Sequence, residues 1–128
     1  MEIGDARTMK IASRRRWNRT GVHVQPGQSF HLTASGRWKD LFDLSDPGGH
    51  DGSKWVYRLA DSWRRAPHLP WFSLVGALDR DTSSFFAIGL ESTWSAPRAG
   101  EITCFANDVN LMYWNNRGSV TLRIERVK

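Results

Sequence analysis

The sequence predicts an all-β protein, an antiparallel β-sandwich built from about seven or eight short strands. Two observations lead to this fold class. Gly and Pro residues interrupt the chain so often that little room is left for a helix of about ten residues or more. Between these breaks, apolar and polar residues alternate, which is typical of strands that bury one face. The pattern fits an immunoglobulin-like and a jelly-roll topology equally well.

The alternation is clearest in Ser29–Ser35 and in Val120–Glu125, each of which directs its apolar residues to one face. Gly21–Gln25 ends at the Pro26–Gly27 turn, so it forms either a hairpin or a sheet corner with Ser29–Ser35. The interval 40–70 has mixed polarity and several turn signals, which predicts an extended loop over one end of the sandwich. Further strands are expected at Met9–Ser13, Trp55–Leu59, Leu74–Leu78, Phe85–Ile88 and Glu101–Ala106.

All 128 residues are expected to form a single domain, 1–128, because this length suits one hydrophobic core. Hydrophobic residues make up 40% of the chain and include 7 Trp, a composition that argues against intrinsic disorder. We expect no membrane span, since no stretch approaches about 18 consecutive apolar residues. The N-terminal residues lack the apolar stretch of a secretory signal, which leaves a cytoplasmic location or export by an unconventional route.

The sequence contains no recognisable catalytic motif, and we expect a protein that is not an enzyme. It has no Gly-x-Ser-x-Gly nucleophile elbow, phosphate-binding loop or dinucleotide fingerprint. Asp79 and Asp81 could form a glycosidase pair, but a turn between two strands accounts for them more simply. Cys104 lies in an apolar run, which predicts a small buried side chain and not a nucleophile. The histidines lack the spacing of zinc ligands: His23, His31, His50 and His68.

The chain is basic, with a formal net charge of +5, and its electric field favours anionic partners. Arg14–Arg16 form the densest cluster and precede Trp17, while Trp63 precedes Arg64–Arg65. One interpretation is a module that binds nucleic acid or an acidic polysaccharide through these clusters, with the Trp rings as stacking surfaces. A solvated basic face is the simpler interpretation, so nucleic acid is not the partner we expect. A structural role without a small ligand is a further alternative.

The segment from Phe105 to Arg123 carries the most chemical information. A strand ends at Asn107, a short loop follows, and Asn115 leads into the last strand. Side-chain oxygens gather around this loop, and such hard ligands suit calcium. The same residue types also form turns through their own backbone hydrogen bonds, which explains them without a metal. The oxygens belong to Asp108, Asn110, Asn115 and Asn116.

Between Trp17 and Ile124 the chain resembles the small bacterial galactose-binding lectins of the PA-IL type. The most specific part of the resemblance is an Asn-Asp-Val run, a short loop and an Asn-Asn-x-Gly-Ser run into the final strand. The matching residues are, in order, Trp17, Thr20–Val22, Pro26–Gly27, Ala34–Gly36, Trp38, Gly76–Leu78, Phe86, Ile88–Gly89, Asn107–Val109 and Asn115–Ser119.

The resemblance implies a jelly-roll-like sandwich of the galactose-binding type, a calcium site and a homo-oligomer. By position, side-chain oxygens of Asp108, Asn115 and Asn116 would bind the ion. The backbone carbonyl of Met112 would add a ligand, and a further carbonyl would come from Asp40 or Leu41.

The same resemblance implies that a galactose-like sugar completes the coordination of the ion. Asp108, Val109 and Asn115 would then also contact the sugar. The sugar-contacting His of the family has two candidates here, His50 and His68, and no Gln lies nearby. A ring for the apolar face of the sugar is expected from Trp114, Tyr113 or Trp71. The protein is therefore expected to be a carbohydrate-binding module.

Overall fold

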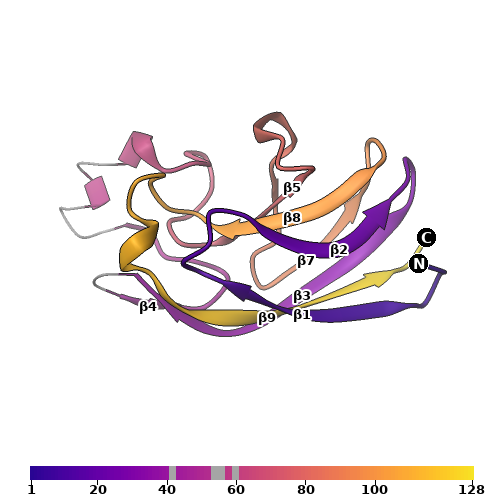
Figure 1. Ribbon diagram of the computed structural model, residues 1–128, viewed down its shortest axis with the longest axis horizontal. Helices are drawn as coiled ribbons and strands as arrows, with labels where there is room; N and C mark the ends of the chain where they lie inside the picture. The colour runs from indigo at the N-terminus through magenta and orange to yellow at the C-terminus, as the bar shows by residue number, and fades with distance from the viewer. Residues whose placement is uncertain (41–42, 53–56, 59–60) are drawn as a thin grey trace.

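The computed structural model is a sandwich of two antiparallel β-sheets, which confirms the predicted fold class (Figure 1). The structure describes residues 1–40, 43–52, 57–58 and 61–128. The first sheet has the order β1-β9-β3-β4, with β7 also paired to β3, and the second has the order β2-β8-β5-β6. The strands are β1 (Ala6–Ala12), β2 (Asn18–Val24), β3 (Ser29–Lys39), β4 (Leu44–Ser45), β5 (Leu74–Leu78), β6 (Phe86–Ala87), β7 (Glu91–Ser95), β8 (Gly100–Ala106) and β9 (Arg117–Arg126).

The described residues also contain three single turns of 3-10 helix, which lie in the connections between strands. They are η1 (Asp61–Trp63), η2 (Thr82–Ser84) and η3 (Tyr113–Asn115). In this part of the chain, no helix has the length and apolar character that crossing a membrane requires.

The core lies between the two sheets, and β3 and β9 supply its first layer (Figure 1). Phe30, Leu32 and Trp38 alternate along β3 with more exposed residues and are themselves fully buried. Trp38 connects the two sheets, because its Nε1 donates a 3.1 Å hydrogen bond to the carbonyl oxygen of Phe72, which precedes β5. The two rings also meet edge to face, with 5.6 Å between their centres.

The central strands of the second sheet, β5 and β8, are buried on both faces. One face packs against the first sheet, and the other carries a smaller apolar cluster. In this cluster Ala66, Trp17 and Phe85 pack against Val75 and Phe105. Two covered faces explain why both strands read as continuous apolar runs, LVGAL and ITCFA, instead of alternating. The cluster also brings the 64–70 segment against the end of β8.

Most predicted strands agree with the structure. The expected Leu74–Leu78 coincides with β5, and Ser29–Ser35 is the first part of the longer β3. The Pro26–Gly27 turn joins β2 of the second sheet to β3 of the first, so this connection is a sheet corner and not a hairpin. Asp79 and Asp81 lie in a turn after β5, as the simpler interpretation predicted. Arg98 pairs with both carboxylates there.

One predicted strand is wrong, and two observed strands, the two-residue β4 and β7, were not predicted. In the expected strand Trp55–Leu59, Tyr57 and Arg58 are helical, and the remaining residues lie outside the described part of the chain. β7 (Glu91–Ser95) is the longer of these two strands, and it pairs with Ser29–Thr33 of β3. Its residues are exposed or half-buried, because the strand lies at the sheet edge, so the apolar signal is weak.

Replacing Trp38 with alanine should lower the free energy of unfolding by about 3–5 kcal/mol, because the substitution leaves a cavity between the sheets and an unpaired carbonyl at Phe72. Urea unfolding followed by circular dichroism measures this change. Trp63→Ala is the matched control, since the Trp63 side chain is 68% exposed, and it should change stability by less than about 0.5 kcal/mol. Equal losses for both variants would contradict the role assigned to Trp38.

Candidate functional site

The connection between β8 and β9 is attached to the 64–70 segment by the buried amide of Asn107. Its Oδ1 accepts a 2.9 Å hydrogen bond from the backbone N–H of Ala66. Its Nδ2 is directed at the carbonyl oxygens of Ala66, Leu69 and Pro70, at distances of 2.9, 3.2 and 3.0 Å. Asn107 therefore fixes the chain at the point where β8 ends and Asp108 begins the connection.

Tyr113 holds the other half of this connection from inside. Its ring is buried, and its hydroxyl donates to the carbonyl oxygen of Ala106 and accepts from Nη1 of Arg65, 2.9 Å away. Because η3 is one short turn around this residue, the chain reverses and presents Asn116 next to Asp108. Tyr113 thus packs in the protein interior and offers no ring face to a sugar.

Asp108 is buried at the start of the connection, and its carboxylate is only partly compensated. Oδ1 accepts a 2.7 Å hydrogen bond from the N–H of Val109, and the Asn116 side chain also hydrogen-bonds the carboxyl. Burial nevertheless raises the pKa of Asp108 to about 6, and the negative charge of Asp40 acts in the same direction. The protein therefore holds a carboxylate where a positive charge would stabilise it.

Asn116 is fully buried, and the two ends of its amide differ. Nδ2 donates a 3.0 Å hydrogen bond to the carbonyl oxygen of Ser13. Oδ1 is buried and has no hydrogen-bond partner among the described residues. An unpaired buried amide oxygen is rare in folded proteins and requires an explanation such as an ion or an ordered water.

Asp40 follows β3 and adds a second buried acid to the site. Its Oδ2 accepts a 2.7 Å hydrogen bond from the hydroxyl of Tyr57, and its Oδ1 accepts one of 2.8 Å from the N–H of Asp43. Nε2 of His50 lies 3.8 Å from Oδ2 of Asp40, and within the described chain this buried nitrogen has no hydrogen-bond partner. Both Asp40 and His50 interact electrostatically with Asp108.

The structure thus gathers most of the predicted calcium ligands at the ends of β3, β8 and β9. Asp40, Asp108, Asn115 and Asn116 are all buried there. The carbonyl oxygen of Met112 accepts a 3.3 Å hydrogen bond from the N–H of Asn115 within the same loop. The alternative carbonyl donor, Leu41, lies outside the described residues.

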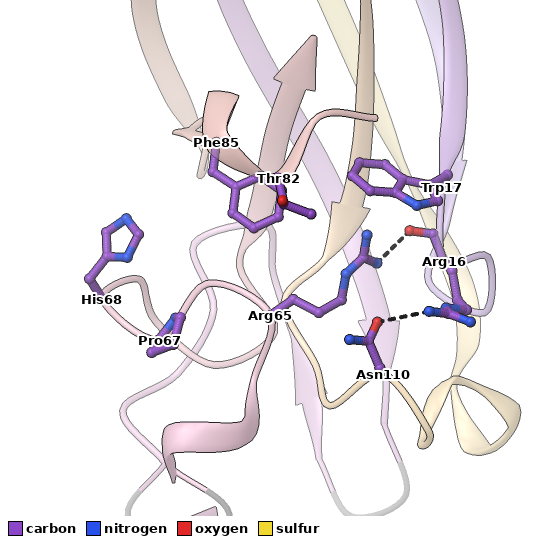
Figure 2. A pocket seen from close by; sticks show the side chains of 8 residues that line it. All are labelled: Arg16, Trp17, Arg65, Pro67, His68, Thr82, Phe85 and Asn110. Atoms are coloured by element: carbon purple, nitrogen blue, oxygen red, sulfur yellow. Dashed lines mark hydrogen bonds between the residues drawn. The ribbon is translucent and has the colours of Figure 1, made fainter. Parts of the chain in front are cut away.

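The predicted sugar-contacting residues are divided between two places. His50 lies with the acids, and Val109 follows Asp108 and pairs with Arg64 in an isolated bridge. Trp114 is 62% exposed on the β8–β9 connection. Trp71 is buried, and its ring packs against that of Tyr57 with 5.2 Å between the ring centres. His68 lines a separate pocket (Figure 2).

The donor set of the site fits calcium better than a transition metal. It consists of carboxylate, amide and backbone oxygens, which are the ligands that calcium takes in loops of variable geometry. Within residues 1–40, 43–52, 57–58 and 61–128, no group of three His, Cys, Asp or Glu side chains is placed to hold a metal. The unpaired Oδ1 of Asn116 beside the buried Asp108 is the feature that a hard cation would satisfy.

Comparison with solved structures finds a similar chain described as "EclA N-terminal domain; PllA-like lectin". The two chains share 22% sequence identity and superpose with a TM-score of 0.69, over 93% of this chain and 94% of that chain. The similarity shows that the β-sandwich is common to both along almost their whole length. No protein-family model and no curated protein matches the sequence.

In metal-free buffer the protein should lose stability as the pH rises from about 4 to about 7, because of Asp108. Its folded pKa, about 6, lies above the ordinary value of 3.8, so the stabilising contribution is complete below 3.8 and is lost as the pH passes 6. The difference corresponds to roughly 3 kcal/mol. Urea unfolding at several pH values measures it.

The variant Asp108→Asn should flatten this pH dependence, since it removes the titrating group. Asp5→Asn is the control, because Asp5 is exposed and its removal leaves the site intact. If wild type and Asp108→Asn keep the same slope between about pH 4 and 7, the carboxyl is not held as described.

Proposed function

We propose that the protein is a lectin, a carbohydrate-binding module that uses a calcium ion held at the β8–β9 connection. The observation that carries the proposal is the buried and unpaired Oδ1 of Asn116 next to the desolvated Asp108 carboxylate. The shared fold with a solved lectin domain supports the same function. The proposal includes no catalytic residue.

Five groups of this chain would hold the ion. Side-chain oxygens would come from Asp108, Asn115 and Asn116, and backbone carbonyls from Met112 and Asp40. Calcium accepts about six to eight oxygens, so when bound it would leave positions for two neighbouring hydroxyls of a sugar. The negative charges of Asp40 and Asp108 would balance the charge of the ion.

The sugar would lie against residues at the rim of the same site. The buried Nε2 of His50 has no hydrogen-bond partner among the described residues, and we expect it to hydrogen-bond a sugar hydroxyl when the sugar enters the site. A pocket of about 260 Å³ opens beside His50, lined also by Arg37 and Ser45. Trp114 is exposed on the β8–β9 connection and would pack on the apolar face of a pyranose. A galactose-like sugar is the ligand we expect, from the Asn-Asp-Val and Asn-Asn-x-Gly-Ser motifs.

Calcium titrated into protein that has passed over a chelating resin should bind at one site per chain. Asp108→Ala should weaken this binding at least about tenfold, because it removes the charged ligand. Isothermal titration calorimetry measures both affinities, and near-ultraviolet circular dichroism checks that the variant is folded. Asp5→Ala is the control for the loss of one acid and should bind like wild type. No heat of binding in wild type, or an unaltered affinity in Asp108→Ala, would contradict the calcium site.

On a glycan array the protein should bind galactose-containing glycans with calcium present and lose the signal when calcium is omitted. The signal should change little between about 50 and 200 mM salt, because hydroxyl–metal contacts are insensitive to ionic screening. A steep loss over that salt range would instead favour a basic module that holds anions through Arg14–Arg16. The lectin function would be wrong if the array gave no signal under any of these conditions.

A further inference from the structure

A second pocket, of about 380 Å³, opens over the outer face of the second sheet (Figure 2). Residues from four different connections line it. Arg16 and Trp17 come from the β1–β2 connection, Arg65 and His68 from the 64–70 segment, Phe85 from the β5–β6 connection, and Asn110 from the β8–β9 connection. Its volume lies near the lower end of the roughly 300–1,000 Å³ that small-molecule sites occupy, which suits one ring.

Arg65 is the central cation of this pocket. Its guanidinium carbon lies 3.6 Å from the ring centre of Phe105 and 4.4 Å from that of Trp17, so both aromatic faces stabilise its charge. Nη1 donates to the carbonyl oxygen of Arg16 and to the hydroxyl of Tyr113. Nε and Nη2 have no partner among the described residues and are not fully buried, so two donors of a planar fork stay accessible.

Arg16 places a second positive charge beside the first, and no acid among the described residues pairs with either of them. Its Nη2 donates a 3.2 Å hydrogen bond to Oδ1 of Asn110, which is a neutral partner. Burial lowers the pKa of Arg65, and the charge of Arg16 lowers it further. Neither guanidinium forms an ion pair with a carboxylate in the described chain, whereas Arg19 pairs with Glu101.

Two neighbouring guanidinium groups, one of them half-buried, repel each other unless an anion lies between them. A carboxylate matches the planar fork of Arg65 and would accept from both side chains. The pocket therefore has the chemistry of an anion site at its polar end.

The apolar end of the pocket is formed by two half-buried rings. The centres of Trp17 and Phe85 are 6.4 Å apart, and their planes are inclined at 49°. Figure 2 shows the Trp17 ring next to the Arg65 guanidinium, the Phe85 ring on the other side of the pocket, and His68 farther out. A ligand that fills this space combines a flat or partly apolar ring with a negative charge, and polar groups on the ring would meet His68 and Asn110.

We infer that this pocket binds a carboxylate-bearing sugar, such as a uronic acid, without calcium. That the ligand is an anion follows from Arg16 and Arg65 alone, while its identity as a sugar rests on the proposed lectin function. The acid group lies at the two guanidinium groups, and the pyranose ring lies on Trp17 and Phe85. The protein would thus read an acidic sugar and a neutral sugar at two separate sites that share the β8–β9 connection.

The test is a titration of glucuronate into resin-treated protein without calcium, at constant ionic strength, followed by NMR or calorimetry. Soluble chelators are omitted because they carry carboxylates themselves. Glucuronate should bind, and galactose at the same concentration should not. Arg16→Gln should weaken glucuronate binding roughly tenfold, because it removes a charged donor and keeps the aliphatic stem and a polar end. Arg14→Gln is the matched control, since Arg14 is exposed and lies outside the pocket lining, and it should bind like wild type.

Absence of glucuronate binding, or equal binding by Arg16→Gln and wild type, would overturn the site. Benzoate and inorganic phosphate test other sources of negative charge under the same conditions. If either binds as tightly as glucuronate, the pocket does not select an acidic sugar. Calcium-dependent binding of galactose is measured in a separate experiment, so the failure of one proposal leaves the other unaffected.

Discussion

Two buried polar side chains, Asn107 and Tyr113, determine the conformation of the β8–β9 connection, and both candidate sites depend on it. The Asn107 amide holds the 64–70 segment against the end of β8, and the Tyr113 hydroxyl ties η3 to the carbonyl of Ala106. On one side this arrangement brings Asn116 beside the buried Asp108. On the other it places Arg65, which hydrogen-bonds Tyr113, under the second pocket. The fully hydrogen-bonded Asn107 and Tyr113 thus hold in place two groups that lack a partner. These are the unpaired oxygen of Asn116 and the Arg65 guanidinium, which has no ion-pair partner among the described residues.

The contrast between satisfied and unsatisfied amides carries the functional interpretation. The buried Asn18 accepts from the N–H of Ala12 and donates to the carbonyl oxygens of Ala12 and Cys104. Asn107 is satisfied in the same way. Only one end of the Asn116 amide is paired, and the nearby Asp108 carries a raised pKa. A fold that pairs the buried Asn18 and Asn107 so fully has kept an oxygen of Asn116 unpaired where a carboxylate needs a cation, which is the arrangement that a hard metal ion would complete.

Sequence patterns predicted the parts of the fold that depend on local periodicity. β3 and β9 alternate because one face is buried, and β5 is continuously apolar because both faces are. β7 was not predictable from periodicity, since an edge strand with half-buried residues has little apolar contrast. The helical Tyr57 and Arg58 lie in a segment whose residue types favour neither state clearly, so the surrounding structure decides.

The candidate sites divide in the same way. The residues proposed as calcium ligands could be picked out from the sequence because a compact motif, from Asn107 to Asn116, contains most of them, and only Asp40 had to come from elsewhere. The second pocket could not be predicted from the sequence, because the residues that line it come from four connections far apart in the chain. Its one local signal was the adjacency of Arg16 to Trp17, which was interpreted as part of a basic face. His68 was one of two candidates, with His50, for the sugar-contacting His, and the structure places it at the second pocket.

Anomalous diffraction from crystals grown with calcium tests the central claim most directly, because it locates the ion independently of any activity. The account predicts one anomalous peak within bonding distance of Asp108, Oδ1 of Asn116 and the backbone of Asp40, at about 2.3–2.6 Å from each oxygen. A map without a peak there, with an ordered water bonded to Oδ1 of Asn116 instead, would contradict it.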